Sequence, residues 1–335
     1  MTLPFHRILV TGGAGFIGSN FVHHLLHAYG GASPKACCPD QARYETHAAV
    51  KDLAVLNLDK LTYAGRLENL HGVDKHPAYR FVKADICDTD AVEQAFAAFK
   101  PQAVVHFAAE SHVDRSIEAG DVFVKTNVLG TQVLLDAARR HGVQHFLHVS
   151  TDEVYGSIDE GSFKEGDRLH AASPYSASKA GSDLLVLSHR ITYKLPVSIT
   201  RCTNNYGPRQ HPEKLLPKIL GLAARGEQLP IYGTGLNVRD WLYVKDHCTG
   251  ILQVLRQPPG EVWNIGASDE KTNLEVVHAV LKATGKPESL ITYVKDRPGH
   301  DWRYSLDSSK LRAKGWKPKT GFADGLADTR RALGA

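Results

Sequence analysis

The sequence predicts an α/β fold: a doubly wound parallel sheet with a smaller, interleaved C-terminal lobe. Apolar strand-like runs alternate with amphipathic helical segments over the first 200 residues, a pattern typical of a parallel sheet covered by helices on both faces. Small or acidic residues follow each predicted strand, where such sheets bind ligands. We expect residues 1–200 and about 236–268 to form the nucleotide-binding domain, and about 201–235 and 269–335 the second lobe.

Composition and charge exclude several classes of protein. The 335 residues are 42% hydrophobic and 23% charged, which suits a globular protein with a sizeable core. A net charge of +4 without a basic stripe does not predict nucleic-acid binding. The five cysteines, including the neighbours Cys37 and Cys38, show no metal-ligand spacing, so no metal is expected. We found neither a signal peptide nor a long apolar run, and we therefore expect a soluble, cytoplasmic protein without a membrane partner.

The first predicted strand, His6–Thr11, is followed directly by a glycine-rich turn and an amphipathic helix. The glycines at this turn are Gly12, Gly15 and Gly18. Glycine permits a tight turn and a close backbone approach, and the helix N-terminus offers amide donors to a pyrophosphate. Placed between a strand and a helix, this spacing predicts a dinucleotide site of the Rossmann type.

An acidic residue is expected at the end of the second strand, about 20 residues further on. That distance falls within residues 30–50, which lack strand character, and we interpret them as a loop insertion without a ligand role. The following apolar run ends at Asp59, the expected ribose ligand; Asp40 and Glu45 are alternatives, but neither closes a strand. A carboxylate there would repel a 2′-phosphate, so we expect NAD rather than NADP.

The next three predicted strands carry further candidates at their carboxyl ends. One strand ends at Asp85, where Asp85 and Ile86 are expected to flank the adenine. The next leads into Ala108 and Ala109, whose small side chains leave backbone along the cofactor. Segments Ala91–Phe99 and Val122–Arg140 between them have helical apolar spacing.

The fifth predicted strand leads into the acid–base residues. Asp152 and Glu153 form an adjacent acidic pair directly after Thr151. Tyr175 and Lys179 stand four residues apart in a predicted helix, so both side chains lie on one face. A lysine ammonium near a phenol favours the phenolate and provides a general base. The alternative is an ordinary surface pair beside a solvated turn.

Three cations on separate C-terminal loops are suited to a diphosphate. They are Lys214, Arg239 and Arg297, in segments rich in glycine, proline and charge. Solvated surface charges are the alternative interpretation. The C-terminal lobe is expected to be interleaved with the first domain because Asp246–Arg256 and the following EVWNIG resemble another helix and strand.

Taken together, these segments resemble the dTDP-glucose 4,6-dehydratases of the extended short-chain dehydrogenase/reductase superfamily. The resemblance covers nearly the whole chain through blocks such as TGGAGFIGSN, LDKLTYAG, AAESHVDRSI, STDEVYG, SPYSASKA, TNNYGPRQHPEKLLP, VRDWLYV and DRPGHDWRY. The glycine turn and Tyr-x-x-x-Lys are shared across the superfamily, whereas the acidic pair after Thr151 separates dehydratases from epimerases.

The resemblance implies two sets of ligand-binding residues. The residues implied to bind NAD are Gly12, Gly15, Phe16, Ile17, Gly18, Asp59, Lys60, Leu61, Thr62, Asp85, Ile86, Phe107, Ala108, Ala109, Ser111, Thr126, Tyr175, Lys179 and Asn205. Those implied to bind the nucleotide sugar are Ser111, Thr151, Asn204, Lys214, Leu215, Pro230, Ile231, Tyr232, Arg239, Asn273, Asp296, Arg297 and His300.

The resemblance also implies a reaction and an assembly. Tyr175, assisted by Lys179 and Thr151, would take the C4 hydroxyl proton during oxidation by NAD. Glu153 would then remove the C5 proton and Asp152 would protonate the departing C6 hydroxyl, before reduction at C6. A homodimer is implied, with helices Val122–Arg140 and Tyr175–Tyr193 of two subunits packed together, and Leu184, Leu187 and Val133 suggest this second buried face. The alternatives are an enzyme acting on a UDP-, GDP- or CDP-linked sugar and a catalytically silent nucleotide-binding protein.

Overall fold

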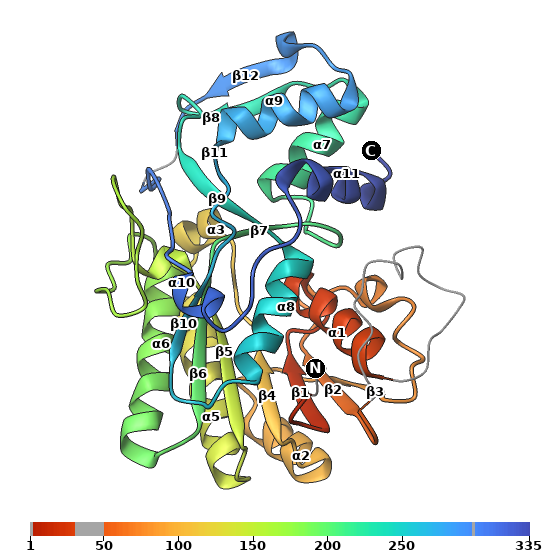
Figure 1. The fold of residues 1–335 in the computed structure, drawn as a ribbon, viewed down its shortest axis with the longest axis vertical. Coiled ribbons are helices and arrows are strands. Elements are labelled where there is room, and N and C mark those ends of the chain that lie inside the picture. Colours follow the sequence, from red (N-terminus) through yellow and green to blue (C-terminus); the bar gives the residue numbers. More distant parts are fainter. Residues whose placement is uncertain (1–2, 31–49, 297–298) are drawn as a thin grey trace. The chain divides into compact units, whose positions relative to one another are not determined.

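The computed structural model describes residues 3–30, 50–296 and 299–335 (Figure 1). The chain divides into two compact units, each assembled from separate segments. Unit 1 comprises Met1–Ser150, Ser173–Thr200 and Ile251–Trp263; unit 2 comprises Thr151–Ala172, Arg201–Gly250 and Asn264–Ala335. The predicted insertion at 30–50, including Cys37, Cys38, Asp40 and Glu45, falls almost entirely outside the described residues, as does Arg297.

The expected doubly wound sheet is confirmed. Its seven strands have the order β10-β6-β5-β4-β1-β2-β3, and the pairs from β5 to β3 are parallel. The strands are β1 (Arg7–Thr11), β2 (Ala54–Asp59), β3 (Tyr79–Lys83), β4 (Ala103–His106), β5 (His145–Thr151), β6 (Val197–Cys202) and β10 (Val262–Ile265). The strand order reverses between β1 and β4, and the crevice at such a point is where dinucleotides bind.

Helices cover this sheet on both faces. The α-helices are α1 (Phe16–Tyr29), α2 (Thr89–Phe99), α3 (Val113–Glu118), α4 (Gly120–Phe123), α5 (Thr131–Arg140), α6 (Pro174–Tyr193) and α8 (Val244–Leu255), with a 3₁₀ turn η2 (Leu67–Leu70). Leu9 of β1 and Val104 of β4 belong to the buried core formed with α2, α5 and α6. Ile8 and Val10 are equally buried but point to the other face, because side chains alternate along a strand.

The predicted helix Val122–Arg140 is not one regular helix. It begins within α4, widens into a π-helix over Val124–Gly130 (η3), and continues as α5. Gly130 lies at the end of the wide segment, where a Cβ atom would stand 2.5 Å from the Cδ1 atom of Ile86. Because periodicity signals only an apolar face, it did not reveal this local change of winding.

Unit 2 contains two small sheets, four complete α-helices and the first part of α8 among its described residues. One sheet has the order β11-β9-β7 and the other pairs β12 with β8. The elements are 3₁₀ turn η4 (Asp152–Val154), β7 (Asn204–Tyr206), α7 (Leu215–Arg225), β8 (Leu229–Tyr232), β9 (Val238–Tyr243), β11 (Glu270–Thr272), α9 (Asn273–Thr284), 3₁₀ turn η5 (Glu288–Leu290), β12 (Ile291–Val294), α10 (Ser309–Arg312) and α11 (Phe322–Leu333). Their core includes Leu220, Trp241, Val277 and Phe322.

The observed boundaries differ from the expected domain ranges. Residues 236–250, expected in the nucleotide-binding domain, lie in unit 2 because β9 pairs with β7 and β11 rather than joining the large sheet. Residues 151–172 also belong to unit 2, where Phe163 forms a bridge with Leu306. The exchange points between the two units therefore lie at other residues than the expected domain boundaries.

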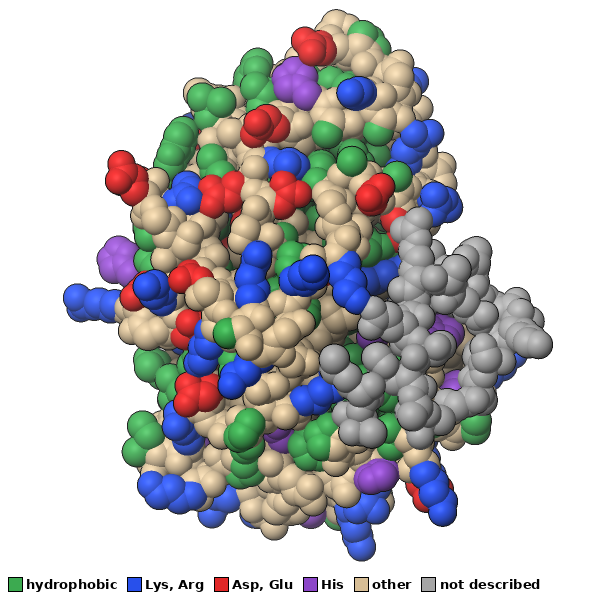
Figure 2. Space-filling model, viewed as in Figure 1, with side chains coloured by type: hydrophobic (Ala, Val, Ile, Leu, Met, Phe, Trp, Pro, Cys, Tyr) green, Lys and Arg blue, Asp and Glu red, His purple; other side chains and the backbone are tan. Residues whose placement is uncertain are grey.

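No helix of the described ranges combines the length and apolar character needed to cross a bilayer. On the face drawn in Figure 2, basic and acidic side chains are interspersed, in keeping with the net charge of +4.

The turn after β1 provides a direct test of this fold. Gly12 has φ +72°, and a Cβ atom there would lie 2.5 Å from the backbone nitrogen of Ala108. Gly142 has φ +64°, and a Cβ atom there would meet nothing within 4 Å, so it isolates the cost of the backbone angle. We expect Gly142→Ala to lower the free energy of unfolding by about 1–2 kcal/mol. Gly12→Ala should add an overpacking cost of about 1–3 kcal/mol.

Urea denaturation of both variants measures this difference. Equal losses for the two variants would contradict the close approach of the β1 and β4 turns.

Candidate active site

The glycine turn is built from backbone contacts to the neighbouring strands. The Gly12 N–H donates to the Leu58 carbonyl at 3.0 Å, and the Gly15 N–H donates to the Gly12 carbonyl at 3.1 Å. Gly15 caps α1 without a side-chain hydrogen bond, and the first turn of this helix contains no acidic residue. The first amides of α1 are therefore uncapped by a side chain, as a pyrophosphate site requires.

Asp59 closes β2 as predicted, and its carboxylate braces the glycine turn. One oxygen accepts from the Ala14 N–H at 2.9 Å and the other from the Leu61 N–H at 2.8 Å. Burial raises the pKa of Asp59, and these two backbone hydrogen bonds oppose that shift. Each carboxylate oxygen retains acceptor capacity for a ribose hydroxyl.

The neighbouring candidates hold the loop after β2. Lys60 forms an ion pair with Asp85 at 2.6 Å, and the Cys87 N–H donates to the same carboxylate at 2.9 Å. Burial alone would raise the pKa of Asp85, but the hydrogen bond from Lys60 makes the net shift downward. Ile86, expected beside the adenine, is 4% exposed and its side chain belongs to the core.

The end of β4 lies against the glycine turn. The Phe107 N–H donates to the Thr11 carbonyl at 3.0 Å, and the Phe107 ring packs against Phe21 with centroids 5.3 Å apart. The Ala108 backbone is the surface that leaves no room for a side chain at Gly12. Thus the Phe107 side chain packs inside unit 1, while the backbone at Ala108 remains near the turn.

Helix α6 positions Tyr175 and Lys179 as predicted. Ser173 caps the helix in a reciprocal capping box with Ser176, and Pro174 occupies its first turn. Tyr175 is 8% exposed and meets Phe123 edge to face. The Lys179 ammonium donates to the Val149 carbonyl at 2.9 Å, which ties α6 to the end of β5.

Two buried residues near this pair escaped the sequence analysis. His148 Nε2 lies 3.3 Å from Lys179 Nζ and 3.0 Å from Ser182 Oγ. Asn127 exchanges hydrogen bonds with the backbone of Glu110 and donates to Ser178 Oγ at 2.8 Å. Thr126, a predicted NAD ligand, is the preceding residue in η3. Their only sequence signal is their position inside TNVLGT and HVSTD.

The acidic pair lies in unit 2, directly after Thr151, the last residue of β5. Thr151 Oγ1 donates to Asp152 Oδ1 at 3.2 Å and accepts from the Glu153 N–H at 3.3 Å. Asp152 is 3% exposed, and its Oδ2 atom has no hydrogen-bond partner among the described residues. Burial and the neighbouring Glu153 raise the pKa of Asp152 well above its usual value. Glu153 is half-buried, so the two carboxyl groups occupy different environments.

Arg239 lies in a strand and not on a loop as the sequence suggested, and its burial excludes the alternative of a solvated surface charge. It lies in β9, is 5% exposed, and its guanidinium stacks 4.3 Å from the centre of the Tyr304 ring. The guanidinium donates to the carbonyl oxygens of Val238, Trp302 and Asp301 at 2.7, 3.2 and 2.9 Å. Tyr304 donates in turn to the Asp301 carboxylate. Burial and then Glu153 raise the pKa of Tyr304.

The other predicted nucleotide-sugar ligands are spread over unit 2. Lys214 caps α7, Leu215 begins that helix and packs against the core, and Asn273 begins α9. In β8, Ile231 is buried in the core, Pro230 is half-buried and Tyr232 is 40% exposed. The Nδ1 atom of His300 lies 2.7 Å from the Oδ1 atom of Asp296. Asn204 and Asn205 lie in β7, and Asn205 Oδ1 is 2.9 Å from His247 Nδ1.

The remaining candidates lie in unit 1. Ile17 and Gly18 belong to the first turn of α1, while Thr62 follows the Asp59–Leu61 turn. Ala109 and Ser111 lie in the segment between β4 and α3. No group of three or more His, Cys, Asp or Glu side chains suited to a metal ion occurs within residues 3–30, 50–296 and 299–335.

The chain is similar to several characterised proteins over nearly its full length. It is 51% identical over 320 residues to the low-salt glycan biosynthesis protein Agl12 of Haloferax volcanii, covering 95% of this chain and 96% of that protein. It is 50% identical to a dTDP-glucose 4,6-dehydratase of Actinoplanes, covering 96% of each chain.

Among solved structures, DesIV, a dTDP-glucose 4,6-dehydratase of Streptomyces venezuelae with NAD bound, superposes with a TM-score of 0.88 at 50% identity and covers 97% of this chain and 96% of that one. A UDP-glucose 4-epimerase of Thermus thermophilus in complex with NAD has a TM-score of 0.84 at 33% identity, covering 98% and 99%.

A Rossmann-type sheet, a glycine turn and a buried Tyr-x-x-x-Lys pair on α6 define an extended short-chain dehydrogenase/reductase. The GDP-mannose 4,6 dehydratase family matches residues 9–329. Within this group of nucleotide-sugar enzymes, the chain belongs to the family of dTDP-glucose 4,6-dehydratases.

The environment of Asp152 predicts an unusual dependence of stability on pH. Because the pKa is raised in the folded state, the folded protein binds more protons than the unfolded protein between the unfolded pKa and the folded pKa. This contribution to stability is fully present below about pH 4 and is lost as the pH rises through the folded pKa. Relative to Asp152→Asn, the wild type should lose about 1.4 kcal/mol for each pH unit in that window.

Urea denaturation of both proteins at pH 4.5, 5.5, 6.5 and 7.5 measures this difference. A difference between the two proteins that stays constant over this range would contradict a protonated Asp152.

Proposed function

We propose that this protein dehydrates dTDP-glucose to dTDP-4-keto-6-deoxy-glucose, a step in deoxysugar biosynthesis. The observation that carries this proposal is the buried acid Asp152, whose pKa is raised well above its usual value beside the more exposed Glu153. Two adjacent carboxyl groups can serve as an acid and a base only when their environments separate their pKa values. The relatives that share about half of the sequence, including DesIV, bear the name of this activity.

The residues of unit 1 fit NAD. The uncapped N-terminus of α1 suits the pyrophosphate, Gly12 permits close approach of the backbone, and Asp59 has acceptor capacity for a ribose hydroxyl. Bound NAD would supply the acceptor for oxidation at C4 and the donor for reduction at C6. DesIV was crystallised with NAD, in agreement with this assignment.

The proton transfers fall to the chain's own residues. Tyr175 takes the C4 hydroxyl proton, and Lys179, anchored to the Val149 carbonyl, favours its phenolate. Oxidation at C4 makes the C5 proton acidic, and Glu153 removes it. Asp152 carries the proton that the departing C6 hydroxyl needs, and Thr151 orients its carboxyl through the contact to Oδ1. Protonation turns a poor leaving group into water.

Substitutions of Asp152, Glu153 and Tyr175 should stop the reaction at different steps. In Asp152→Asn, oxidation at C4 continues, so reduced nicotinamide absorbance should appear while product formation falls about 10²–10⁴-fold. In Tyr175→Phe, the C4 hydroxyl proton has no acceptor, and no such absorbance should appear. Glu153→Gln should in addition suppress exchange of the C5 proton with solvent. Single-turnover absorbance with dTDP-glucose, together with product mass, measures all three variants.

Identical behaviour of Asp152→Asn and Tyr175→Phe would show that this division of labour is wrong. Parallel incubation with UDP-glucose separates the alternative substrates, because preferred turnover of UDP-glucose would replace the dTDP assignment. A product without loss of water would indicate an epimerase.

We further propose that the protein is a cytoplasmic homodimer joined through unit 1. Helices α4, η3 and α6 are neighbours, and each of them exposes at least one apolar side chain. These are Val122, Val124, Leu129, Leu184 and Ile191, with exposed fractions from 44% to 70%. Of the residues first considered for this face, Leu184 is exposed, whereas Val133 and Leu187 pack against the core of unit 1. An apolar face of this kind fits a second copy of the same chain.

Charged substitutions on this face should produce a monomer. Leu184→Glu combined with Ile191→Glu places two carboxylates where apolar contacts are proposed, at positions 60% and 70% exposed in the single chain. Leu67→Glu, at a position 49% exposed on η2, is the matched control and should leave the mass unchanged. Light scattering at micromolar concentration gives the mass. A wild-type monomer, or a dimer that survives the double substitution, would refute this interface.

A further inference from the structure

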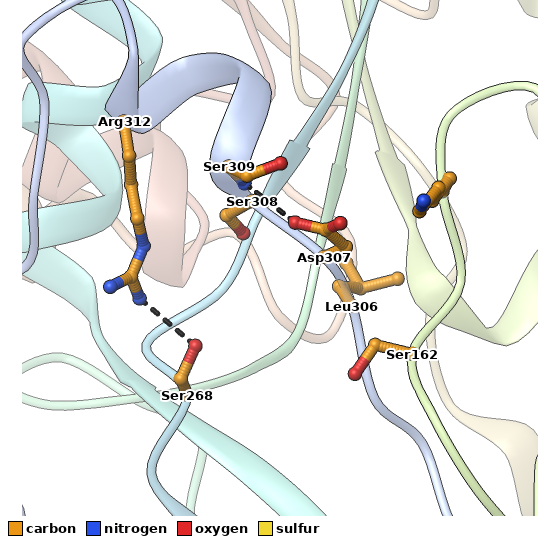
Figure 3. A pocket seen from close by; sticks show the side chains of 8 residues that line it. Ser162, Ser268, Leu306, Asp307, Ser308, Ser309 and Arg312 are labelled. Atoms are coloured by element: carbon orange, nitrogen blue, oxygen red, sulfur yellow. Dashed lines mark hydrogen bonds between the residues drawn. The ribbon is translucent and has the colours of Figure 1, made fainter.

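Unit 2 contains a polar pocket that none of the predicted catalytic, cofactor or substrate residues lines. Its volume is about 490 Å³, within the range of small-molecule sites. Three chain segments form it: the loop at 162–164, the loop at Ser268, and the segment from Leu306 to Arg312. Its lining residues are Ser162, Lys164, Ser268, Leu306, Asp307, Ser308, Ser309 and Arg312 (Figure 3).

The charges of this pocket favour an anionic ligand. Lys164 and Arg312 supply two cations and Asp307 one carboxylate, which leaves a net charge of one positive. Arg312 is held in place, since its guanidinium donates to Ser268 Oγ at 2.9 Å and to the Ala267 carbonyl at 3.2 Å. Among the described residues, no carboxylate oxygen lies within 4.0 Å of the charged nitrogen atoms of either cation. Their charge is therefore not cancelled by an ion pair within the described chain.

Hydroxyl groups make up most of the remaining lining. Ser308 is only 3% exposed, and its Oγ accepts from the Gly266 N–H at 2.8 Å, so its own hydrogen can be donated to a ligand. Ser162, Ser268 and Ser309 add three more hydroxyls, and Leu306 is the one apolar side chain among the eight. Ser162 and Ser268 already bond to Ser305 and Arg312, but a hydroxyl has one donor and two acceptor positions and so keeps capacity for a ligand. A polyhydroxylated ligand could use this capacity, whereas an apolar ligand could not.

Asp307 restricts the ligand further. Figure 3 shows its carboxylate facing the open space near Ser309, and Oδ1 accepts from the Ser309 N–H at 2.8 Å. The Ser309 backbone hydrogen bond, with smaller effects of Lys164 and Arg312, lowers the pKa of Asp307. An ionised carboxylate accepts hydroxyl hydrogens and repels a bare anion that fills the pocket. The ligand should therefore combine one anionic group with hydroxyl groups.

We propose that this pocket is a second ligand site that binds a sugar phosphate. The phosphate group pairs with Lys164 and Arg312, and the sugar hydroxyls bond to Asp307 and the serines. Arginine and lysine are the side chains that most often bind phosphate, and a carboxylate is a strong acceptor for sugar hydroxyls. The site uses no residue of the proposed dehydratase reaction, so either assignment can fail without the other.

Calorimetric titration of the full chain with glucose 6-phosphate tests this site. The wild type should bind it, while glucose and inorganic phosphate, each carrying half of the recognised groups, should bind at least about tenfold more weakly. Lys164→Gln removes one cation and should weaken glucose 6-phosphate about tenfold or more. The Lys164 side chain has no hydrogen bond within the described chain, so this variant should fold normally. Lys317→Gln makes the same change at an exposed position outside the pocket and should bind like the wild type.

The variants also separate this pocket from the nucleotide-sugar site, which does not include Lys164. Binding that is unchanged in Lys164→Gln would place the ligand elsewhere and overturn the proposal. Inorganic phosphate binding as tightly as glucose 6-phosphate would overturn the assignment of a sugar phosphate. The absence of binding at millimolar concentrations of glucose 6-phosphate would overturn the site itself.

Discussion

The close approach of two turns, after β1 and after β4, is the constraint on which unit 1 depends. Gly12 stands so near the Ala108 backbone that no side chain fits between them. Asp59 then fixes the same turn from the β2 side through the Ala14 N–H. Three neighbouring strands thus meet at one backbone surface, and the amides of α1 are presented beside it. A dinucleotide site follows from this packing because small residues keep the backbone accessible.

In unit 2, burial has a different effect, because it raises the pKa of a single carboxyl group, that of Asp152. Asp152 is removed from water next to another carboxyl group, and the nearby guanidinium of Arg239 offsets these two effects on its pKa only in part. A buried carboxyl group without a close cation favours its neutral form. The family to which the chain belongs acts by dehydration, and the role proposed for Asp152 as the acid depends on this raised pKa.

Local signals predicted the fold and part of the site. Asp59 was found because it ends an apolar run, and Tyr175 and Lys179 because their spacing falls on one helical face. The contact of His148 with Lys179 spans 31 residues and the contact of Asn127 with Ser178 spans 51, so no local pattern reveals them. Arg239 was placed on a loop, and its burial was not foreseen, because its carbonyl partners lie up to 63 residues away. The unit boundaries were missed for the same reason, because the pairing of strand β9 with β7 and β11 depends on tertiary packing rather than on local sequence.

The number of residues in the wide turn η3 determines which side chains of α5 face the core and which face outward. An α-helix rotates by about 100° per residue, so one additional residue in a turn changes the direction of every side chain that follows. Along this segment Asn127 is buried toward Ser178, while Val124 and Leu129 are exposed. Removal of one residue from Val124–Gly130 without a compensating change of winding would turn α5 by about 100° relative to α4. The length of this segment is therefore as constrained as its composition, and a chimaera of two relatives joined here must keep the count of residues.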